Sequence, residues 1–256
     1  MNPVIDCLLK HRSFRKYKDT PVEQEKLDLI IKAAQAAPNW CNAQHVSIIS
    51  VKNKETKAKL AKWSLNQSYI ETCPLFLVFC ADFYRTNLVF EKNGRDMKPF
   101  VEHLDSVIIG SHEVGYAMEN AIVAAESMGL GTVCIGGIRQ TSLSVVKELN
   151  LPKYVFPVVG LCVGYPDENP EVKPRLNKEA VFFEEKYDTS KLKEEIDKYD
   201  EVYRNYVKNR ETHSKDITWS DQLSAYYESE VKDGKGIYDQ DYELLKQQGF
   251  IVIDKK

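Results

Sequence analysis

Several residues that could bind a phosphate lie close together near the amino terminus. Two guanidinium groups, an imidazole and a hydroxyl stand on five consecutive positions (His11, Arg12, Ser13, Phe14, Arg15). Such groups can surround a phosphate with charge-assisted hydrogen bonds. Taken alone, the segment is more often a solvated basic turn, because short basic motifs match by chance.

A second pair of cations stands on either side of a proline, at Lys173 and Arg175. Proline fixes its own φ and favours an extended conformation in the residue before it, so both cations can be held in a defined relation. Taken alone, this segment is more typical of a charged loop.

A group of glycines follows a long helical pattern (Gly129, Gly131, Gly136, Gly137). A dinucleotide-binding fingerprint needs its glycines between a strand and the following helix, and here that order is reversed. The Gly136-Gly137 pair, which follows Ile135, could instead offer backbone N–H groups that a flat ring approaches closely. A simple tight turn is the alternative.

Polar amides and an indole occupy the connection at 38–44 (Pro38, Asn39, Trp40, Cys41, Asn42, Ala43, Gln44). This loop could line an aromatic cofactor or be an ordinary connection. The histidines show no metal-ligand spacing, and neither a nucleophile elbow nor a phosphate-loop lysine motif is present, so we expect no metal and no catalytic triad. Cys41 is expected to be a free thiol of undefined role.

The elements that must position these residues alternate between helix and strand up to about residue 165. Apolar runs predict strands at 46–51, 75–81, 132–135 and 156–163, and the run at 75–81 lacks alternation, as in a strand covered on both faces. Helices are predicted at 3–10, 21–36 (with a capping box at Thr20 and Glu23), 55–63, 103–128 and 143–149. This order indicates an α/β or α+β class. Helices near 190–207, 219–230 and 240–247 precede an apolar end at 250–253.

Composition excludes several classes of protein. With 35 basic and 38 acidic side chains among 256 residues, the chain has a net charge of −3 and lacks the basic surface of a nucleic-acid-binding protein. The longest apolar runs are far shorter than a membrane span, and the amino terminus does not resemble a secretory signal. Six cysteines without a Cys-x-x-Cys pair favour reduced thiols and a cytoplasmic location.

Taken in their order along the chain, these motifs resemble those of the nitroreductase family. More narrowly, they resemble its oxygen-insensitive NADPH nitroreductase and NADPH-flavin oxidoreductase group. The resemblance is strong from about residue 3 to 187 and looser beyond. It implies an α+β fold with a mainly antiparallel central sheet covered by helices, and a homodimer that exchanges a C-terminal strand. Residues 1–187 would form the FMN-binding core. Residues 188–256 would form a helical extension that wraps the partner, with a mobile NAD(P)H-binding loop near 208–216.

The resemblance also implies roles for single residues. His11, Ser13, Lys173 and Arg175 would hold the FMN phosphate, and Arg12 would lie along the ribityl side. Arg15 would sit beside N1 and O2 of the ring, where a cation stabilises the reduced flavin. Gln67 would bond the polar edge of the ring, and Ile135, Gly136 and Gly137 would present backbone near N5 and O4. The loop with Pro38, Asn39, Trp40 and Asn42 would close the site from the partner chain.

The activity implied is ping-pong transfer of hydride from NAD(P)H through FMN to nitroaromatics, quinones or free flavin. No side chain need be catalytic in the strict sense. Arg210 and Lys215 are the expected contacts of the NADPH 2′-phosphate, but Glu211 and Asp216 leave NADH open as a donor. Two alternatives stay open at this point: a non-catalytic flavin or nucleotide carrier, and a reductive FMN enzyme with a narrow acceptor. The physiological acceptor is not defined by sequence.

Overall fold

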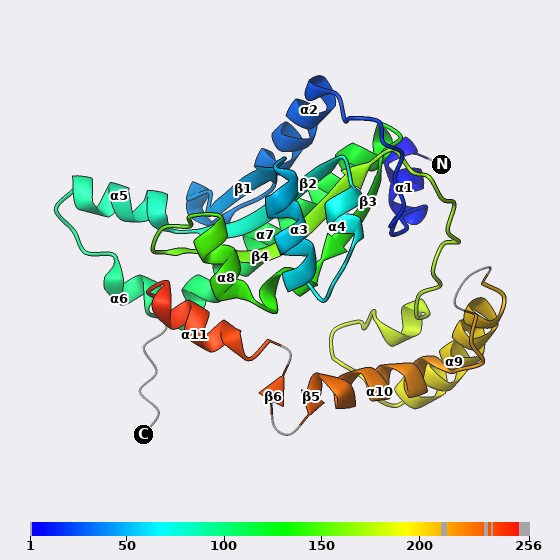
Figure 1. Cartoon of the computed structure of the whole chain (residues 1–256). Helices are drawn as coiled ribbons and strands as arrows, with labels where there is room; N and C mark the ends of the chain where they lie inside the picture. Colours follow the sequence, from blue (N-terminus) through cyan, green and yellow to red (C-terminus); the bar gives the residue numbers. More distant parts are fainter. Residues whose placement is uncertain (1, 211–213, 233–234, 237, 251–256) are drawn as a thin grey trace. The chain divides into compact units, whose positions relative to one another are not determined.

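The computed structural model describes residues 2–210, 214–232, 235–236 and 238–250. The chain divides into two compact units (Figure 1). The first comprises Met1–Pro170 and Tyr238–Lys256, and the second comprises Glu171–Ile237. The boundary predicted at residue 187 lies inside the second unit.

The first unit is built on a sheet of four strands in the order β1-β2-β4-β3, in which every neighbouring pair is antiparallel. The strands are β1 (Val46–Val51), β2 (Leu75–Asp82), β3 (Gly131–Ile135) and β4 (Val155–Gly164). All four predicted strands are therefore found, and the predicted α+β class with an antiparallel sheet covered by helices is confirmed.

Strand β2 lies inside the sheet and is buried along its whole length, as its unbroken apolar sequence predicts. Because side chains of a strand alternate between faces, Leu77 and Phe79 enter one core while Phe76 and Val78 enter the other. One strand thus joins two hydrophobic layers.

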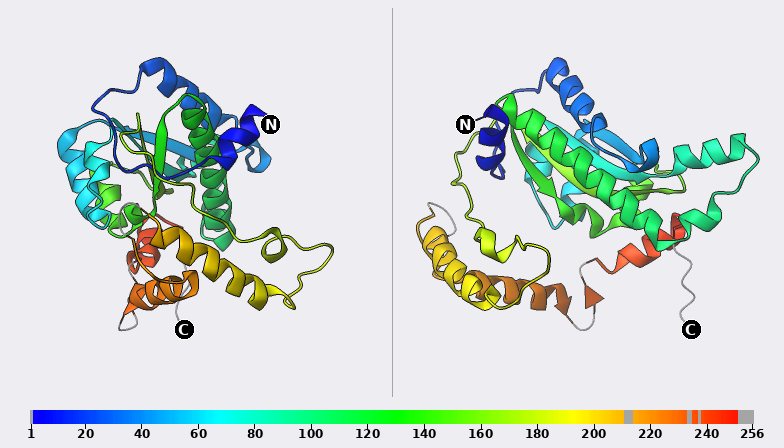
Figure 2. Two further views of the ribbon diagram at one scale, coloured as in Figure 1. Left: turned by 90° about the vertical axis from the view of Figure 1, so that its right-hand side faces the viewer. Right: turned by 180° about the vertical axis from the view of Figure 1, so that it is seen from behind.

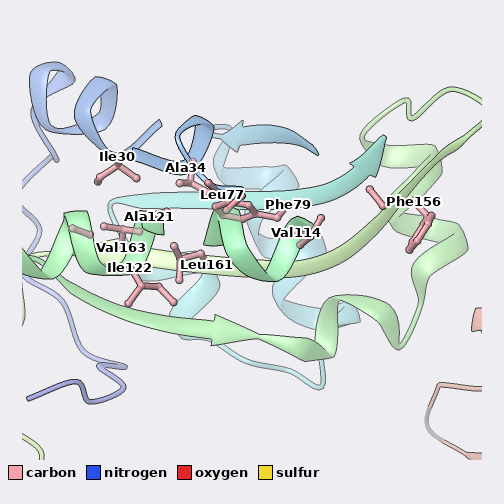
Figure 3. Packing of buried hydrophobic residues seen from close by; sticks show 14 of the residues in the cluster. Ile30, Ala34, Leu77, Phe79, Val114, Ala121, Ile122, Phe156, Leu161 and Val163 are labelled. Carbon is pink, nitrogen blue, oxygen red and sulfur yellow. The ribbon is translucent and has the colours of Figure 1, made fainter. Parts of the chain in front are cut away.

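Helices α2 (Gln24–Gln35) and α7 (Leu104–Ser127) cover the first face. Figure 2 shows α7 lying along the sheet, and Figure 3 shows Val114, Ala121 and Ile122 of α7 packed with the strand residues. With 24 residues, α7 is about 36 Å long. The predicted long buried helix is confirmed.

The opposite face is covered by α3 (Lys54–Trp63), α4 (Tyr69–Thr72) and α8 (Ser142–Glu148), whose buried residues include Leu60, Ile70 and Val145. The remaining elements of this unit are α1 (Pro3–Leu9), η1 (Trp40–Asn42), α5 (Tyr84–Lys92), α6 (Lys98–Val101), η2 (Gly136–Arg139) and α11 (Gln240–Gln247).

The predicted start of α2 is wrong. The helix begins at Gln24, and its cap residue Glu23 makes no side-chain capping bond; the Glu23 carboxylate accepts from the Tyr165 hydroxyl at 2.7 Å instead.

The second unit contains η3 (Lys178–Ala180), α9 (Leu192–Lys208), α10 (Trp219–Glu230), β5 (Val231–Lys232) and β6 (Lys235–Gly236). Its small core joins α9 to the start of α10, where the Tyr199 ring packs edge-on against Trp219 and at a tilt against Tyr203. The helices predicted near 190–207, 219–230 and 240–247 are confirmed.

The carboxyl-terminal strand predicted at 250–253 lies outside the described residues except for Phe250. That ring is fully buried in the first unit and packs edge-on against Phe83 and Phe156. Within the described part of the chain, no helix combines the length and the apolar character that crossing a bilayer demands.

Candidate functional site

The basic amino-terminal segment is fixed alongside β3. Ser13 forms a parallel bridge with Thr132, and the Phe14 backbone N–H donates to the Thr132 carbonyl at 2.8 Å. A Cβ at Gly131 would lie 2.6 Å from the Phe14 ring, so glycine is needed for this close approach. The cations of the segment therefore project from an ordered backbone and not from a free turn.

Glu126, in the last turn of α7, connects this segment to the helix. Its Oε1 accepts from His11 Nδ1 at 2.8 Å and from the Thr132 hydroxyl at 2.7 Å. Because a carboxylate only accepts, Nδ1 of His11 must carry the proton of this bond. Glu126 thus orients the imidazole that the sequence predicts at a phosphate.

Arg12 and Arg15 are held by different partners. Arg12 Nη1 donates to the Pro170 carbonyl at 3.1 Å, and its guanidinium lies 5.6 Å from the centre of the Phe14 ring. The backbone N–H of Arg15 donates to Glu168 at 2.5 Å, and its side chain hydrogen bonds Tyr69. Burial raises the pKa of the Tyr69 hydroxyl and the Arg15 charge opposes that rise, so Tyr69 stays neutral and does not itself compensate the guanidinium charge.

Gln67 lies in the turn between α3 and α4, two residues before Tyr69. Its backbone N–H donates to the Ala61 and Ser64 carbonyls. Its side-chain Oε1 is buried and has no hydrogen-bond partner among the described residues. A buried acceptor of this kind costs free energy unless a ligand supplies a donor.

The glycine pair at the end of β3 meets the same turn. Gly137 is so close to Ser64 that an added Cβ would lie 3.3 Å from its backbone, whereas Gly136 is exposed and an added Cβ there would meet the Tyr238 hydroxyl at 3.8 Å. The structure therefore brings Arg15, Gln67 and the Gly136 backbone to one place through Tyr69 and Ser64. We name this group the Arg15 cluster. The Ile135 side chain is fully buried in the core, so only its backbone can reach a ligand there.

The loop at 38–44 is organised by a buried carboxylate. Glu113 of α7 accepts from the Trp40 backbone N–H and the His45 backbone N–H at 2.8 Å each, and from His45 Nδ1 at 3.0 Å. Cys41, Asn42 and Gln44 all have a positive φ, a backbone conformation that residues other than glycine rarely adopt. The Glu113 bonds hold the loop in this shape, in which Trp40 is 61% exposed.

The loop and His11 are held at different places along α7. Glu113 fixes the loop and Glu126 fixes His11, and the helix between them separates these two carboxylates by about 20 Å. Within one chain, Pro38, Asn39, Trp40 and Asn42 are thus far from His11. Beside the loop lies a cavity of about 740 Å³, lined in part by Asn39, Asn42, Arg85 and Glu113.

The other predicted phosphate ligands belong to the second unit. Arg175 Nη1 donates to the Lys173 carbonyl at 2.9 Å, and the Tyr199 hydroxyl donates to the Pro174 carbonyl at 2.8 Å, so this segment is fixed on α9. Convergence of Lys173 and Arg175 with His11 on one phosphate stays a prediction.

The predicted 2′-phosphate residues also lie in the second unit, and 211–213 between them fall outside the described residues. The Arg210 guanidinium lies 5.9 Å from the centre of the Tyr206 ring, and Lys215 is exposed. Asp216 pairs with Arg204 at 3.5 Å and with Lys208 at 3.4 Å. One carboxylate therefore lies between two exposed cations of α9.

Sequence comparison places the chain among known proteins. The profile of the nitroreductase family matches residues 8–165, and the profile of the nitroreductase family's C-terminal domain matches residues 173–252. The chain belongs to the nitroreductase family. This membership confirms the resemblance inferred from the ordered motifs.

Individual relatives match over nearly the whole chain. A Bacillus subtilis protein named FMN reductase (NAD(P)H) is 41% identical over 253 residues, which cover 98% of this chain and 99% of the relative. The NADPH-flavin oxidoreductase of Vibrio harveyi is 38% identical and covers 88% of this chain and 91% of its own length. The solved structure of Bacillus megaterium NfrA2 is 42% identical, with a TM-score of 0.93, 99% of this chain covered and 100% of that chain.

Three acidic residues and one tyrosine of this site were not predicted: Glu113, Glu126, Glu168 and Tyr69. Two of them had a visible signal, because Glu113 and Glu126 are charged residues inside a mostly apolar helix. A buried charge needs partners, so such positions mark contacts made elsewhere in the chain.

Gln67→Leu separates ligand binding from folding at this site. Leucine removes a buried acceptor that has no partner among the described residues, so we expect the unliganded protein to unfold at an unchanged or higher temperature. The affinity for FMN should fall several-fold, since one hydrogen bond contributes about 1 kcal/mol. Thermal unfolding and FMN titration of the apoprotein measure the two effects. A lower melting temperature with unchanged FMN affinity would contradict the assignment.

Proposed function

We propose that this protein is an FMN-dependent NAD(P)H oxidoreductase that reduces nitroaromatics, quinones or free flavin. The observation that carries the proposal is the Arg15 cluster: a cation, a buried amide oxygen that lacks a donor, and an open glycine backbone lie together. A flat ring with a polar edge supplies the missing N–H donor and gains a cation at its electron-rich side. The names of the Bacillus subtilis and Vibrio harveyi relatives support the same cofactor and donors.

Bound FMN supplies two-electron redox chemistry, which links oxidation of NAD(P)H to reduction of the acceptor. The chain itself would bind and orient. Arg15 would stabilise negative charge at the N1 and O2 edge, Gln67 would accept a hydrogen bond from the ring, and Gly136 would leave its face accessible. His11, oriented by Glu126, would lie with Arg12 and Ser13 along the ribityl phosphate.

The proposed active form is a homodimer in which each site is completed by the partner's loop at 38–44. The separation of about 20 Å along α7 supports this, because it places the loop far from His11 of its own chain. Several large apolar side chains on α1 and α7 are exposed, as expected of a dimer face. They are Val4, Ile5, Leu8, Leu9, Leu104, Ile108 and Tyr116.

Strand exchange at the carboxyl terminus would add residues after Phe250 to the partner's sheet. Strand β1 is an edge strand, and such an edge offers unpaired backbone groups to an added strand. Because Phe250 packs in its own core, only the residues after it would take part. A cytoplasmic location stays a prediction from cysteine composition.

An absorbance spectrum of the purified protein tests the proposal. We expect yellow protein, or colourless protein that becomes yellow with added FMN, and loss of the flavin absorbance on anaerobic titration with NADPH or NADH. A protein that takes up no FMN would refute the proposal. Flavin that stays oxidised with both donors would favour the carrier alternative, and an acceptor screen separates a broad enzyme from a narrow one.

The choice between NADPH and NADH as electron donor tests the roles proposed for residues of the second unit. We expect Arg210→Ala to raise the KM for NADPH much more than the KM for NADH. Asp216→Asn should lower the KM for NADPH several-fold, because it frees Arg204 and Lys208 for the 2′-phosphate, and exposed ion pairs contribute only about 0.2–1 kcal/mol. Steady-state kinetics with both donors measures this. Asp197→Asn, which removes an exposed carboxylate paired with Lys193, is the control. Equal effects on both donors would mean that these residues do not bind the 2′-phosphate.

A further inference from the structure

Three residues outside the proposed flavin contacts form a cluster beside Gly136. Arg139, in η2, donates from Nη1 to Asp241 Oδ2 at 2.8 Å, and its guanidinium lies 4.3 Å from the centre of the Tyr238 ring. The Asp241 backbone N–H donates to the Tyr238 carbonyl at 3.0 Å. Residues about a hundred positions apart thus hold the Tyr238 ring in one orientation.

The hydroxyl of Tyr238 borders the open space at Gly136. Among the described residues outside its chain neighbours, a Cβ on Gly136 would have one heavy atom within 4 Å, the Tyr238 hydroxyl oxygen at 3.8 Å. The proposed function assigns this space to the reactive face of the cofactor. A phenol hydroxyl there can donate a hydrogen bond to a molecule that lies over the Gly136 backbone.

The helix that carries Asp241 is tied to the rest of the unit, and one oxygen of the Asp241 carboxyl lacks a hydrogen-bond donor. Gln240 Oε1 accepts from the Leu143 backbone N–H at 3.4 Å, which ties the start of α11 to α8. Asp241 Oδ1 is buried and has no hydrogen-bond partner among the described residues. Burial raises the pKa of the Asp241 carboxyl, although the Arg139 charge opposes this. Such buried polar groups without partners are concentrated at functional sites.

We propose that Tyr238 is a catalytic residue that hydrogen bonds an oxygen of the bound electron acceptor and gives it the proton that reduction requires. Arg139 and Asp241 hold the ring in place. The inference rests on the proposed function, because it assumes that the acceptor lies against the bound FMN beside Gly136, within reach of the Tyr238 hydroxyl.

The proton balance is simple for a quinone. Reduction to the hydroquinone takes an electron pair and one hydrogen from NAD(P)H, and a second hydrogen as a proton. The O–H bond of Tyr238 breaks, an O–H bond forms on the quinone oxygen, and water returns a proton to the tyrosinate. The Arg139 cation over the ring stabilises that tyrosinate while it exists.

Tyr238→Phe tests this step in the full-length protein loaded with FMN. We expect kcat/KM for benzoquinone to fall at least tenfold, since general acids contribute roughly 10²–10⁴-fold. The rate with ferricyanide should change less than twofold, because ferricyanide takes electrons without a proton. Tyr242→Phe, in helix α11 just after Tyr238, is the matched control and should leave both rates unchanged.

A measurement without turnover complements the kinetics. Titration of the oxidised protein with hydroquinone, in the absence of NAD(P)H, should give a Kd about fivefold higher for Tyr238→Phe than for the wild type. The Kd of FMN for the two apoproteins should be equal. Equal slowing of both acceptors, or no slowing of benzoquinone reduction, would overturn the inference. Failure of the proposed function would differ, because the wild type itself would then bind no FMN or oxidise no NAD(P)H with ferricyanide.

Discussion

Arg15→Ala is expected to weaken FMN binding by roughly 10- to 100-fold and to slow flavin reduction with it. A hydrogen bond to a charged group contributes about 1.5–3 kcal/mol, which corresponds to that range of affinity. Arg15 is an exposed residue and the neighbouring Tyr69 is neutral, so the guanidinium charge can stabilise a reduced ring. Fluorescence titration of the apoprotein and anaerobic stopped-flow reduction measure the two effects.

Lys18→Ala is the matched control for Arg15→Ala. It removes an exposed cation from the same segment, and no hydrogen bond from its side chain is present among those the structure describes. If both variants weaken FMN binding equally, the effect is one of general charge and Arg15 has no special place. If Arg15→Ala binds and reduces FMN normally, the proposed role is wrong.

Glu113→Ala is expected to destabilise the fold by about 3 kcal/mol or more. The substitution leaves two backbone N–H groups and the His45 ring without their acceptor inside the protein, and each such loss costs about 1–3 kcal/mol. For a chain of this size the melting temperature should fall by roughly 6–12 °C. Because the loop loses its support, the affinity for FMN should fall as well if the partner's loop closes the site.

Glu119→Ala provides the control on the same helix, since Glu119 is exposed. Such surface changes usually stay within about 0.5 kcal/mol. Calorimetry of both variants, followed by FMN titration well below their melting temperatures, separates stability from binding. An unchanged melting temperature in Glu113→Ala would show that the loop is supported by other contacts.

The sequence predicted those parts of the fold in which local pattern and burial agree. The apolar run at 75–81 indicated a strand covered on both faces, and β2 is that strand. Helices α5 and α6 were not predicted, because neither shows the spaced apolar residues that packing on a core requires; α5 has no buried residue and α6 has one. The start of α2 was misplaced because the Glu23 carboxylate binds Tyr165, far along the chain, and does not cap its own helix.

Some residues of the candidate site were predicted from the sequence and others were not. Ordered motifs indicated Arg15, Gln67 and the glycine pair, which the structure brings together. Glu113 and Glu126 escaped prediction because the segments that they hold, at His45 and His11, are 68 or more positions away, so no local pattern contains both ends of these contacts. Lys173 and Arg175 lie in the second unit, where their own contacts do not test the predicted role.

The pair of carboxylates on α7 has a consequence for a two-fold assembly. In each subunit, one end of α7 would hold His11 of the subunit's own site. Nearer its middle, α7 would support the loop that closes the site of the other subunit. A substitution of Glu113 in one subunit would then leave that subunit's own FMN site intact and impair the FMN site of the other subunit. The altered residue and the impaired site would therefore belong to different polypeptides.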